Sequence, residues 1–377
     1  MYQRQLNIKN LLKNRSYFLF GPRGVGKSTL IEQTLPQAKI YDLLDAAQFQ
    51  RLLREPTLIS QETTADTLVV IDEIQKLPGL LDEVQRLIVK RKQTFLLTGS
   101  SARKLRKGGA NLLAGRAYQA ALLPLTSQEI PDFDLHTYIN STGLPEFYGN
   151  AGVHDYLKAY VGTYLQEEIK AEALTRNLSG FIRFLEVVAL CNGEEINYAN
   201  ISSDCGVPAR TLEAYFGILN DTLIGFSVLP FLATTKRKAI KRPKYFLFDI
   251  GVVNMLAKRR GIEIGSELFG RAFEHFIALE LRACLSYRHI DLPLEYWRSS
   301  SGFEVDFIIG NKLAIEVKST QLVKDKHLSG IRALKEEGLI EKYIIVSLDA
   351  HERVTEDGII ILPWKIFLHK IWKKLLD

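Results

Sequence analysis

Long apolar runs in the first third of the chain predict buried strands. Tyr17–Phe20 is one such run, and the segments TLVVID (67–72) and TFLLTG (94–99) are two more. Continuous apolar runs of this length are typical of parallel strands that helices cover on both faces. Each run ends in polar or glycine residues, where ligands of open α/β sheets bind. The pattern predicts an α/β domain over residues 1–150.

The middle of the chain changes to helical spacing. From His154 to Asn192 apolar residues recur on one helix face, which predicts helices that form a linker or lid over 151–195 and carry no chemistry. A short helix is then expected to end near Cys205, with a second from about Ala209. Two helices joined by a turn that contains glycine form a helix-turn-helix pattern. Two paired strands, FSVLPFLA and KYFLFDI, follow it and predict a winged helix over 196–250.

Near the C-terminus, Ser301–Thr320 alternates between apolar and polar residues and predicts a β-hairpin. Only a loop of odd length, such as 310–312, puts Phe303, Val305 and Phe307 on the same face as Ile315 and Val317. That register sets Asp306 opposite Glu316, with Lys318 on the same face. Like charges opposite each other repel, and a divalent cation between them would relieve the repulsion.

Composition narrows the classes of protein. The chain has 377 residues, of which 46% are hydrophobic and 24% charged, so a globular protein of two or three domains is expected. It has no apolar run of membrane-spanning length, and its first residues do not resemble a signal peptide. Three cysteines without a CxxC pair indicate neither disulfides nor zinc, and the expected location is the cytoplasm. The net charge of +6 permits a polyanionic partner.

The first apolar run leads into Gly21-x-x-x-x-Gly26-Lys27-Ser28, the pattern of a phosphate-binding P-loop. Its backbone N–H groups would surround the phosphates of ATP, and Lys27 would reach the β- and γ-phosphates. Ser28 and Asp72 would hold Mg²⁺, while Glu73 would orient the attacking water. The nucleotide-binding residues are therefore predicted to be Gly21, Pro22, Arg23, Gly24, Val25, Gly26, Lys27, Ser28, Thr29 and Asp72.

With these motifs in place, the N-terminal domain resembles AAA+ ATPases. The resemblance implies that Ser100, after the third strand, is the polar sensor of the γ-phosphate. It also implies that Arg116 is an arginine finger that reaches a neighbour's nucleotide, which requires a homo-oligomer such as a hexameric ring. The alternative is that Arg116 pairs with a carboxylate of its own domain.

The constellation GFEVDF and IEVKST resembles the PD-(D/E)XK nuclease superfamily, in particular its Holliday-junction-resolvase and RecB-like branches. The resemblance implies that Asp306, Glu316 and an upstream helical glutamate hold a metal and that Lys318 places the attacking water. Both Glu274 and Glu280 lie on that helix, and Glu274 is favoured. The order of all the motifs resembles a prokaryotic family of AAA-type ATPases with a winged helix and a nuclease-like domain, although Gly24 replaces the glutamine of many members.

Basic residues predict where DNA would bind. Six of the nine residues at 236–244, in the loop between the wing strands, are lysine or arginine. Such a loop suits phosphate contacts without sequence readout. The predicted DNA-binding residues are Arg210, Lys236, Arg237, Lys238, Lys241 and Arg242. In the alternative, the winged helix contacts protein or only packs.

These patterns predict four parts: an AAA+-like P-loop ATPase domain (1–150), a helical linker (151–195), a winged helix (196–250) and an α/β PD-(D/E)XK-like domain (251–377). The predicted function is an ATP-hydrolysing DNA-processing protein, a motor or remodeller that acts on duplex or branched DNA. Metal-dependent cleavage by the C-terminal domain is left open. The alternative function is a nucleotide-gated switch that binds protein partners and carries an inactive nuclease fold.

Overall fold

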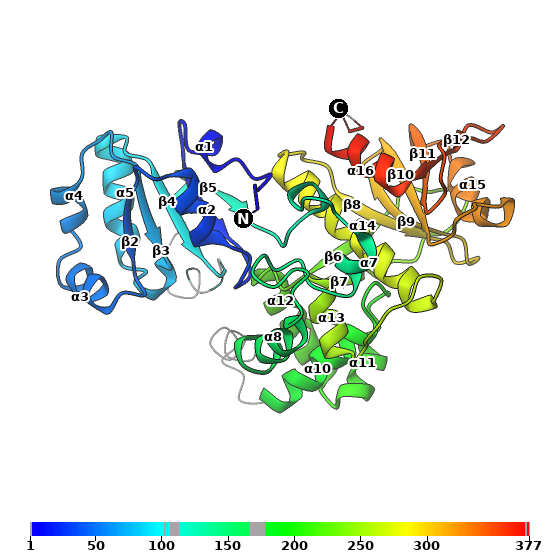
Figure 1. Ribbon diagram of the computed structural model, residues 1–377, viewed down its shortest axis with the longest axis horizontal. Helices are drawn as coiled ribbons and strands as arrows, with labels where there is room; N and C mark the ends of the chain where they lie inside the picture. The colour runs from blue at the N-terminus through cyan, green and yellow to red at the C-terminus, as the bar shows by residue number, and fades with distance from the viewer. Residues whose placement is uncertain are drawn as a thin grey trace.

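The computed structural model describes residues 2–101, 103, 105, 113–165, 178–373 and 375–376. Figure 1 shows two sheets at opposite ends of the molecule, with a group of helices below and between them. The blue N-terminal sheet lies at the left, and the yellow to red C-terminal sheet lies at the right. Among the described residues, no helix is long and apolar enough to span a lipid bilayer.

The N-terminal sheet is parallel throughout, with strand order β2-β3-β4-β1-β5. The three strands predicted from apolar runs are confirmed as β1, β3 and β4, and the residues of β1 and β4 are entirely buried. The strands are β1 (Ser16–Phe20), β2 (Lys39–Asp42), β3 (Val69–Asp72), β4 (Phe95–Gly99) and β5 (Ala117–Ala121). The helices of this part are α1 (Ile8–Leu11), α2 (Lys27–Thr34), α3 (Ala46–Arg54), α4 (Leu58–Glu62) and α5 (Leu80–Arg91), with short 3-10 turns η1 (Ile74–Lys76), η2 (Leu113–Gly115) and η3 (Ser127–Glu129).

The described parts of the middle of the chain are helical, as the spacing predicts, while residues 166–177 of the predicted helical stretch lie outside the described residues. Its elements are α7 (Leu135–Ile139), α8 (Val153–Ala159), the π-helix η4 (Tyr160–Leu165), α10 (Leu178–Leu190), α11 (Tyr198–Cys205) and α12 (Ala209–Asp221). The predicted end at Cys205 and start at Ala209 are both confirmed. Gly206 ends α11 with a φ of 66°, a left-handed conformation that favours glycine.

The C-terminal sheet has eight strands in the order β12-β13-β11-β10-β9-β8-β6-β7. The strands are β6 (Gly225–Pro230), β7 (Lys244–Leu247), β8 (Leu294–Arg298), β9 (Glu304–Ile309), β10 (Leu313–Lys318), β11 (Lys342–Ser347), β12 (Arg353–Val354) and β13 (Ile360–Pro363). Its helices are α13 (Ile250–Leu256), α14 (Glu267–Tyr287), α15 (Ser329–Lys335) and α16 (Trp364–Lys373), and η5 (Asp325–Leu328) is a 3-10 turn. The two strands predicted for a wing pair with each other, but β6 also pairs with β8, so both are part of this sheet.

The hairpin of β9 and β10 has the predicted register. Ile309 pairs with Leu313, so the loop has three residues, and the ladder continues to Phe307 opposite Ile315. The shared apolar face used to predict this register holds only in part. Phe307 and Ile315 pack in one hydrophobic cluster with α14, whereas Val305 packs in another with α15. The backbone ladder ends at the pair of Phe307 and Ile315, and beyond it the Asp306 carboxylate accepts a hydrogen bond from the backbone N–H of Val317 (2.7 Å).

Candidate functional site

The P-loop between β1 and α2 is shaped by close contacts that require glycine. A Cβ at Gly21 would lie 2.4 Å from the carbonyl oxygen of Leu122, so a side chain there would collide with backbone. Gly24 and Gly26 have φ values of 83° and 89°, which L-residues rarely adopt. A Cβ at Gly24 would also lie 3.1 Å from the hydroxyl of Tyr156. The unusual glycine at 24 therefore coincides with an aromatic residue from the helical region packed against the loop.

Polar side chains from three elements meet at the carboxyl ends of β3 and β4. The Ser28 hydroxyl, at the start of α2, donates to the Asp72 carboxylate (3.0 Å). The Thr98 hydroxyl donates to the other oxygen of the same carboxylate and accepts the backbone N–H of Glu73 (3.1 Å). The chain at Glu73 has a φ of 57°. The predicted strand ends are thus brought together into one connected network.

Lys27 is bonded to the P-loop itself. Its ammonium donates to the carbonyl oxygens of Gly21 (2.7 Å) and Pro22 (3.3 Å), and the residue is 8% exposed. A buried ammonium must be neutralised or hydrogen-bonded, and here backbone carbonyls provide those bonds. Phosphate oxygens, being charged, are stronger acceptors than these carbonyls.

This network opens on a cavity of about 1040 Å³, which is large enough for a nucleotide. Its lining includes Arg4, Gly24, Lys27, Ser28, Glu73 and Ser100. The Ser28 hydroxyl and the Asp72 carboxylate are hard oxygen ligands of the kind that Mg²⁺ prefers. The residues present therefore fit Mg²⁺, which would neutralise charge on the β- and γ-phosphates of a bound nucleotide.

Two residues of this site, Gln75 and Arg4, were missed by sequence reasoning. Of the small polar residues at 98–101 that end the third strand, Thr98 holds Asp72, while the buried hydroxyl of Ser100, the predicted γ-phosphate sensor, has no hydrogen-bond partner within the part of the chain that the structure describes. Gln75 donates to the Glu73 carboxylate, and Arg4 lines the cavity from the N-terminal arm. Nothing in the sequence places Arg4 beside the P-loop.

Arg116 lies away from its own chain's cavity. It precedes β5, whose first residue pairs with Ser16 at the amino end of β1, whereas the P-loop follows the carboxyl end of β1. Arg116 is exposed, and it forms no ion pair within the described ranges. The alternative of a carboxylate partner in its own domain thus finds no support there.

A second cluster of charged groups lies where β7, β9, β10 and α14 meet. It contains the predicted metal ligands Glu274, Asp306 and Glu316, and with them Lys318 and two residues that the sequence analysis did not assign to it, Lys244 and Glu304. The Lys244 ammonium is 2.9 Å from Glu274, 2.7 Å from Glu304 and 3.8 Å from Asp306. The Lys318 ammonium lies 2.5 Å from Glu316.

Burial dominates the electrostatics of this cluster. It raises the pKa of Glu274 to about 7, although the ammonium of Lys244 acts in the opposite direction. Burial and the neighbouring Asp306 also raise the pKa of Glu316 well above its ordinary value. Glu280, the other candidate on α14, is not in the cluster: it accepts hydrogen bonds from the backbone N–H of Ser127 and, at 2.7 Å, from the indole N–H of Trp372.

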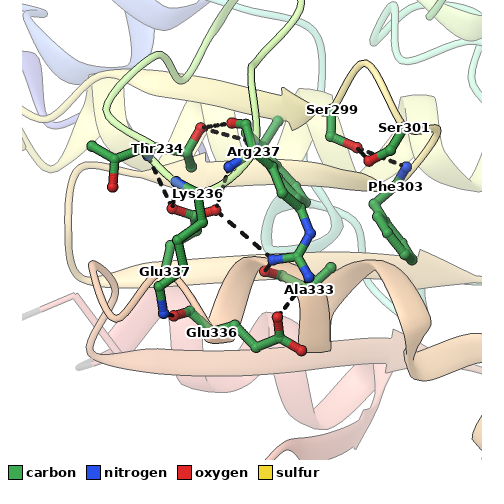
Figure 2. A network of polar contacts seen from close by, with 11 residues as sticks. Thr234, Lys236, Arg237, Ser299, Ser301, Phe303, Ala333, Glu336 and Glu337 are labelled. Atoms are coloured by element: carbon green, nitrogen blue, oxygen red, sulfur yellow. Dashed lines mark hydrogen bonds and ion pairs between the residues drawn. The ribbon is translucent and has the colours of Figure 1, made fainter.

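The basic loop between β6 and β7 is docked on the end of α15, as Figure 2 shows. The backbone N–H groups of Thr235, Lys236 and Arg237 each donate to the Glu337 carboxylate at 3.0 Å. The Arg237 guanidinium pairs with Glu336 (2.6 Å), and the Lys236 ammonium donates to the carbonyl oxygen of the same residue. Two of the predicted DNA contacts are therefore bonded within the chain. The others, Arg210, Lys238, Lys241 and Arg242, are exposed.

Comparison with known families divides the chain into three segments. Residues 13–131 match the model of a family described as AAA domain. Residues 132–263 and 269–367 match two families described as domains of unknown function, DUF8612 and DUF4143. Together with the P-loop network, the first match identifies the N-terminal part as an AAA-type P-loop ATPase domain.

Relatives among curated proteins have no assigned function. An uncharacterized protein of Mycobacterium tuberculosis is 26% identical over 317 residues, which cover 80% of this chain and 70% of that protein. One from Methanocaldococcus jannaschii is 22% identical over 414 residues, covering 94% of this chain and 85% of the relative. Both alignments extend well beyond the ATPase domain.

Among solved structures, the Thermotoga maritima RuvB Holliday junction branch migration motor is similar to this chain at 18% identity. That match covers 56% of this chain and 81% of RuvB, with a TM-score of 0.28. A STAND protein with a tetratricopeptide repeat sensor from Pyrococcus horikoshii matches at 13% identity, covering 77% of this chain and 49% of that one, with a TM-score of 0.23. Likeness at this level does not establish a shared arrangement over the whole chain.

Proposed function

We propose that this protein binds and hydrolyses ATP with Mg²⁺ and uses the turnover to move on or remodel DNA. The observation that carries the ATPase part is the connected network of Ser28, Asp72, Thr98 and Glu73 around the cavity beside Lys27. These are the groups that phosphoryl transfer needs: a cation for the phosphates, oxygen ligands for Mg²⁺ and a carboxylate for water.

Each group then has one role. Lys27 exchanges its bonds to the Gly21 and Pro22 carbonyls for bonds to phosphate oxygens, because charged acceptors are stronger. Ser28 and Asp72 hold Mg²⁺. Thr98 keeps Asp72 and the backbone of Glu73 in place, so that the Glu73 carboxylate can orient the attacking water. Ser100 remains a proposed contact to the γ-phosphate, since the residue lines the cavity and its hydroxyl has no hydrogen-bond partner among the described residues.

The ATPase proposal is tested with two variants. Lys27→Ala removes the cation beside the phosphates and should abolish tight ATP binding, measured with a fluorescent ATP analogue. Glu73→Gln keeps the binding groups and should bind ATP with unchanged affinity, but release of phosphate should fall at least 100-fold, by analogy with the loss of other positioned polar catalytic groups. Normal turnover in both variants would refute the proposal.

DNA is proposed as the partner because two features fit it. The helices α11 and α12 with strands β6 and β7 have the order of a winged helix, and exposed cations lie on α12 and in the β6–β7 loop. Phosphate contacts from such residues bind DNA without reading its sequence. The carboxylates predicted to hold a second metal are already paired with lysines, so the proposal includes no DNA cleavage.

The salt dependence of DNA binding tests this partner. Each phosphate contact contributes a slope of roughly −0.9 in a plot of log affinity against log salt concentration for B-DNA. Replacing Lys238, Lys241 and Arg242 by alanine should flatten the slope by up to about 2.7. The matched control replaces three exposed lysines of the N-terminal part: Lys9, Lys13 and Lys90. If wild type shows no salt-dependent binding to duplex, single-stranded or branched DNA, the nucleotide-gated switch with protein partners replaces this proposal.

A further inference from the structure

The strongest disagreement between the sequence and the structure lies in the carboxylate cluster of the C-terminal sheet. The sequence predicts a divalent cation between Asp306 and Glu316, with Glu274 as a third ligand. In the structure an ammonium group is in contact with two of these three residues. Lys244 lies within 4 Å of Glu274 and Asp306, and its third carboxylate partner is Glu304, at 2.7 Å.

Lys244 is held firmly in this position. Its backbone in β7 pairs with Val228 of β6 on one side and bridges to Glu195 on the other. Its side chain is 5% exposed and also lies over the ring of Tyr296, with the ammonium 5.3 Å from the ring centre. A lysine fixed by two strand neighbours and buried among acidic groups is a structural counter-ion, unlike the exposed lysines of the preceding loop.

The residues present do not fit a divalent metal. Mg²⁺ and similar ions need carboxylate oxygens that converge on one point at roughly 2.0–2.6 Å. Within the described ranges, no group of three His, Cys, Asp or Glu side chains is arranged to hold such an ion. One Asp306 oxygen accepts the Val317 N–H, and Glu316 is paired with Lys318 at 2.5 Å. A metal would have to displace Lys244 and separate these bonds.

Charge balance gives the physical reason. Four acidic side chains (Glu274, Glu304, Asp306 and Glu316) are gathered with two ammonium groups, Lys244 and Lys318, and the Arg298 guanidinium lies 3.8 Å from Glu304 at the edge of the cluster. Buried carboxylates are stable only when they are paired or protonated. Lys244 supplies from within the chain the positive charge that a metal would otherwise bring.

We propose that Lys244 is the resident cation of this cluster: it occupies the place of a divalent metal in the wild-type protein, and its removal creates a divalent-cation site. Lys244 is the last basic residue of the run at 236–244. One lysine of that run therefore pairs with the carboxylates of the cluster and does not contact a nucleic acid. This inference does not depend on ATP hydrolysis, and it can fail while the ATPase proposal holds.

The test is a calorimetric titration of the nucleotide-free full chain with Mn²⁺, in an Asp72→Ala background that removes binding at the P-loop. With Lys244 in place, the protein should show no Mn²⁺ binding that depends on Asp306. Adding Asp306→Asn should therefore leave the titration unchanged. Lys244→Met should gain one Mn²⁺ per chain, and adding Asp306→Asn should remove it again. Lys342→Met is the matched control, an exposed lysine of β11 in the same sheet, and should behave as wild type.

Wild type and two variants of Lys244 give results that distinguish success of the proposal from failure. Lys244→Met leaves four acidic groups with the Lys318 ammonium and the Arg298 guanidinium beside Glu304. A second variant, Lys244→Met with Glu304→Gln, therefore removes one acidic group together with the lysine and keeps the three predicted ligands. A rise in melting temperature on adding Mn²⁺, in either variant and not in wild type, supports the proposal. Mn²⁺ binding by wild type that depends on Asp306 overturns it, and so does the failure of every folded variant to bind Mn²⁺. If neither variant folds, the wild-type titration still tests the proposal. Mn²⁺ binding that depends on Asp306 overturns it, and the absence of such binding supports it.

Discussion

Arg4 offers a measurement of how strongly the N-terminal arm is tied to the nucleotide site. Its guanidinium donates to the Val25 carbonyl of the P-loop (2.7 Å) and lies 3.1 Å from Glu129. It also donates to the hydroxyl of Tyr287, at the end of α14 (3.4 Å). The side chains of Arg4 and Glu129 are 4% and 0% exposed, so this ion pair is buried.

Replacing Arg4 by alanine leaves the Glu129 carboxylate buried with only backbone donors, the N–H groups of Gln5 (2.7 Å) and Thr126 (3.0 Å). Removing one partner of a buried pair costs about 3–5 kcal/mol. With an unfolding entropy of roughly 2.1 cal/mol/K per residue, a chain of 377 residues should lose about 4–6 °C in melting temperature. The Val25 carbonyl also loses its donor, and ATP affinity should fall.

The assay is thermal unfolding followed by circular dichroism, with a double-mutant cycle that adds Glu129→Gln. Because the neutral amide needs no counter-ion, the double variant should be more stable than the sum of the single effects predicts, by about 2 kcal/mol. Arg51→Ala is the control, since Arg51 pairs with Glu62 on the surface and should contribute at most about 1 kcal/mol. Additive effects, or a loss from Arg4→Ala no larger than the control, would refute the buried-pair reasoning.

Two further predictions concern assembly and pH. If Arg116 acts on a neighbour's nucleotide, Arg116→Ala should bind ATP but hydrolyse it about 10³-fold more slowly, and mixing it with Glu73→Gln should restore some turnover; a fully active monomer would exclude this. Burial raises the pKa of Glu280 to about 7, so the folded chain keeps a proton that the unfolded chain loses above pH 4.5. The free energy of unfolding should therefore fall by up to about 3 kcal/mol as pH rises from 5 to 8, relative to Glu280→Gln. The free energy of unfolding of wild type and of Glu280→Gln is measured by urea unfolding across this pH range. If the difference between the two values does not change with pH, the raised pKa of Glu280 is contradicted.

Elements with a local signal could be predicted from the sequence. The strands at Tyr17–Phe20 and Val69–Asp72 are continuous apolar runs, and the turn at Gly206 needs a left-handed residue. The hairpin register followed from side-chain alternation, although one of its supporting arguments was only partly right. What the pattern did not predict is that β6 pairs with β8, because a strand's neighbour in another part of the chain leaves no mark on its own alternation.

The same limit explains which residues of the two sites could be predicted from the sequence. The P-loop and Asp72 carry their chemistry in short motifs, whereas Lys244 belongs to its cluster only through residues 30 to 62 positions away. From the sequence alone, Lys244 is interpreted as the last basic residue of a basic loop. Lys236 and Arg237 likewise read as phosphate ligands, yet their partners lie about 100 residues further on. A run of like charges indicates the sign of the charge on its partner, but it does not identify that partner.

The contacts behind the P-loop argue that the ATPase domain is not an independent unit. Within the domain, the P-loop carbonyl of Val25 accepts a bond from Arg4 of the N-terminal arm. The carbonyl of Arg23 accepts a bond from outside the domain, from the hydroxyl of Tyr160 in η4 (3.0 Å). Val25 and Leu30 belong to the same hydrophobic cluster as Phe184 and Leu219 of the helical region. A fragment that ends at the family boundary near residue 131 would expose this apolar surface to water and leave the loop without the Tyr160 contact. In the proposed function Lys27 exchanges its bonds to this loop for bonds to the phosphates, and the helices that pack behind the loop are in direct contact with it.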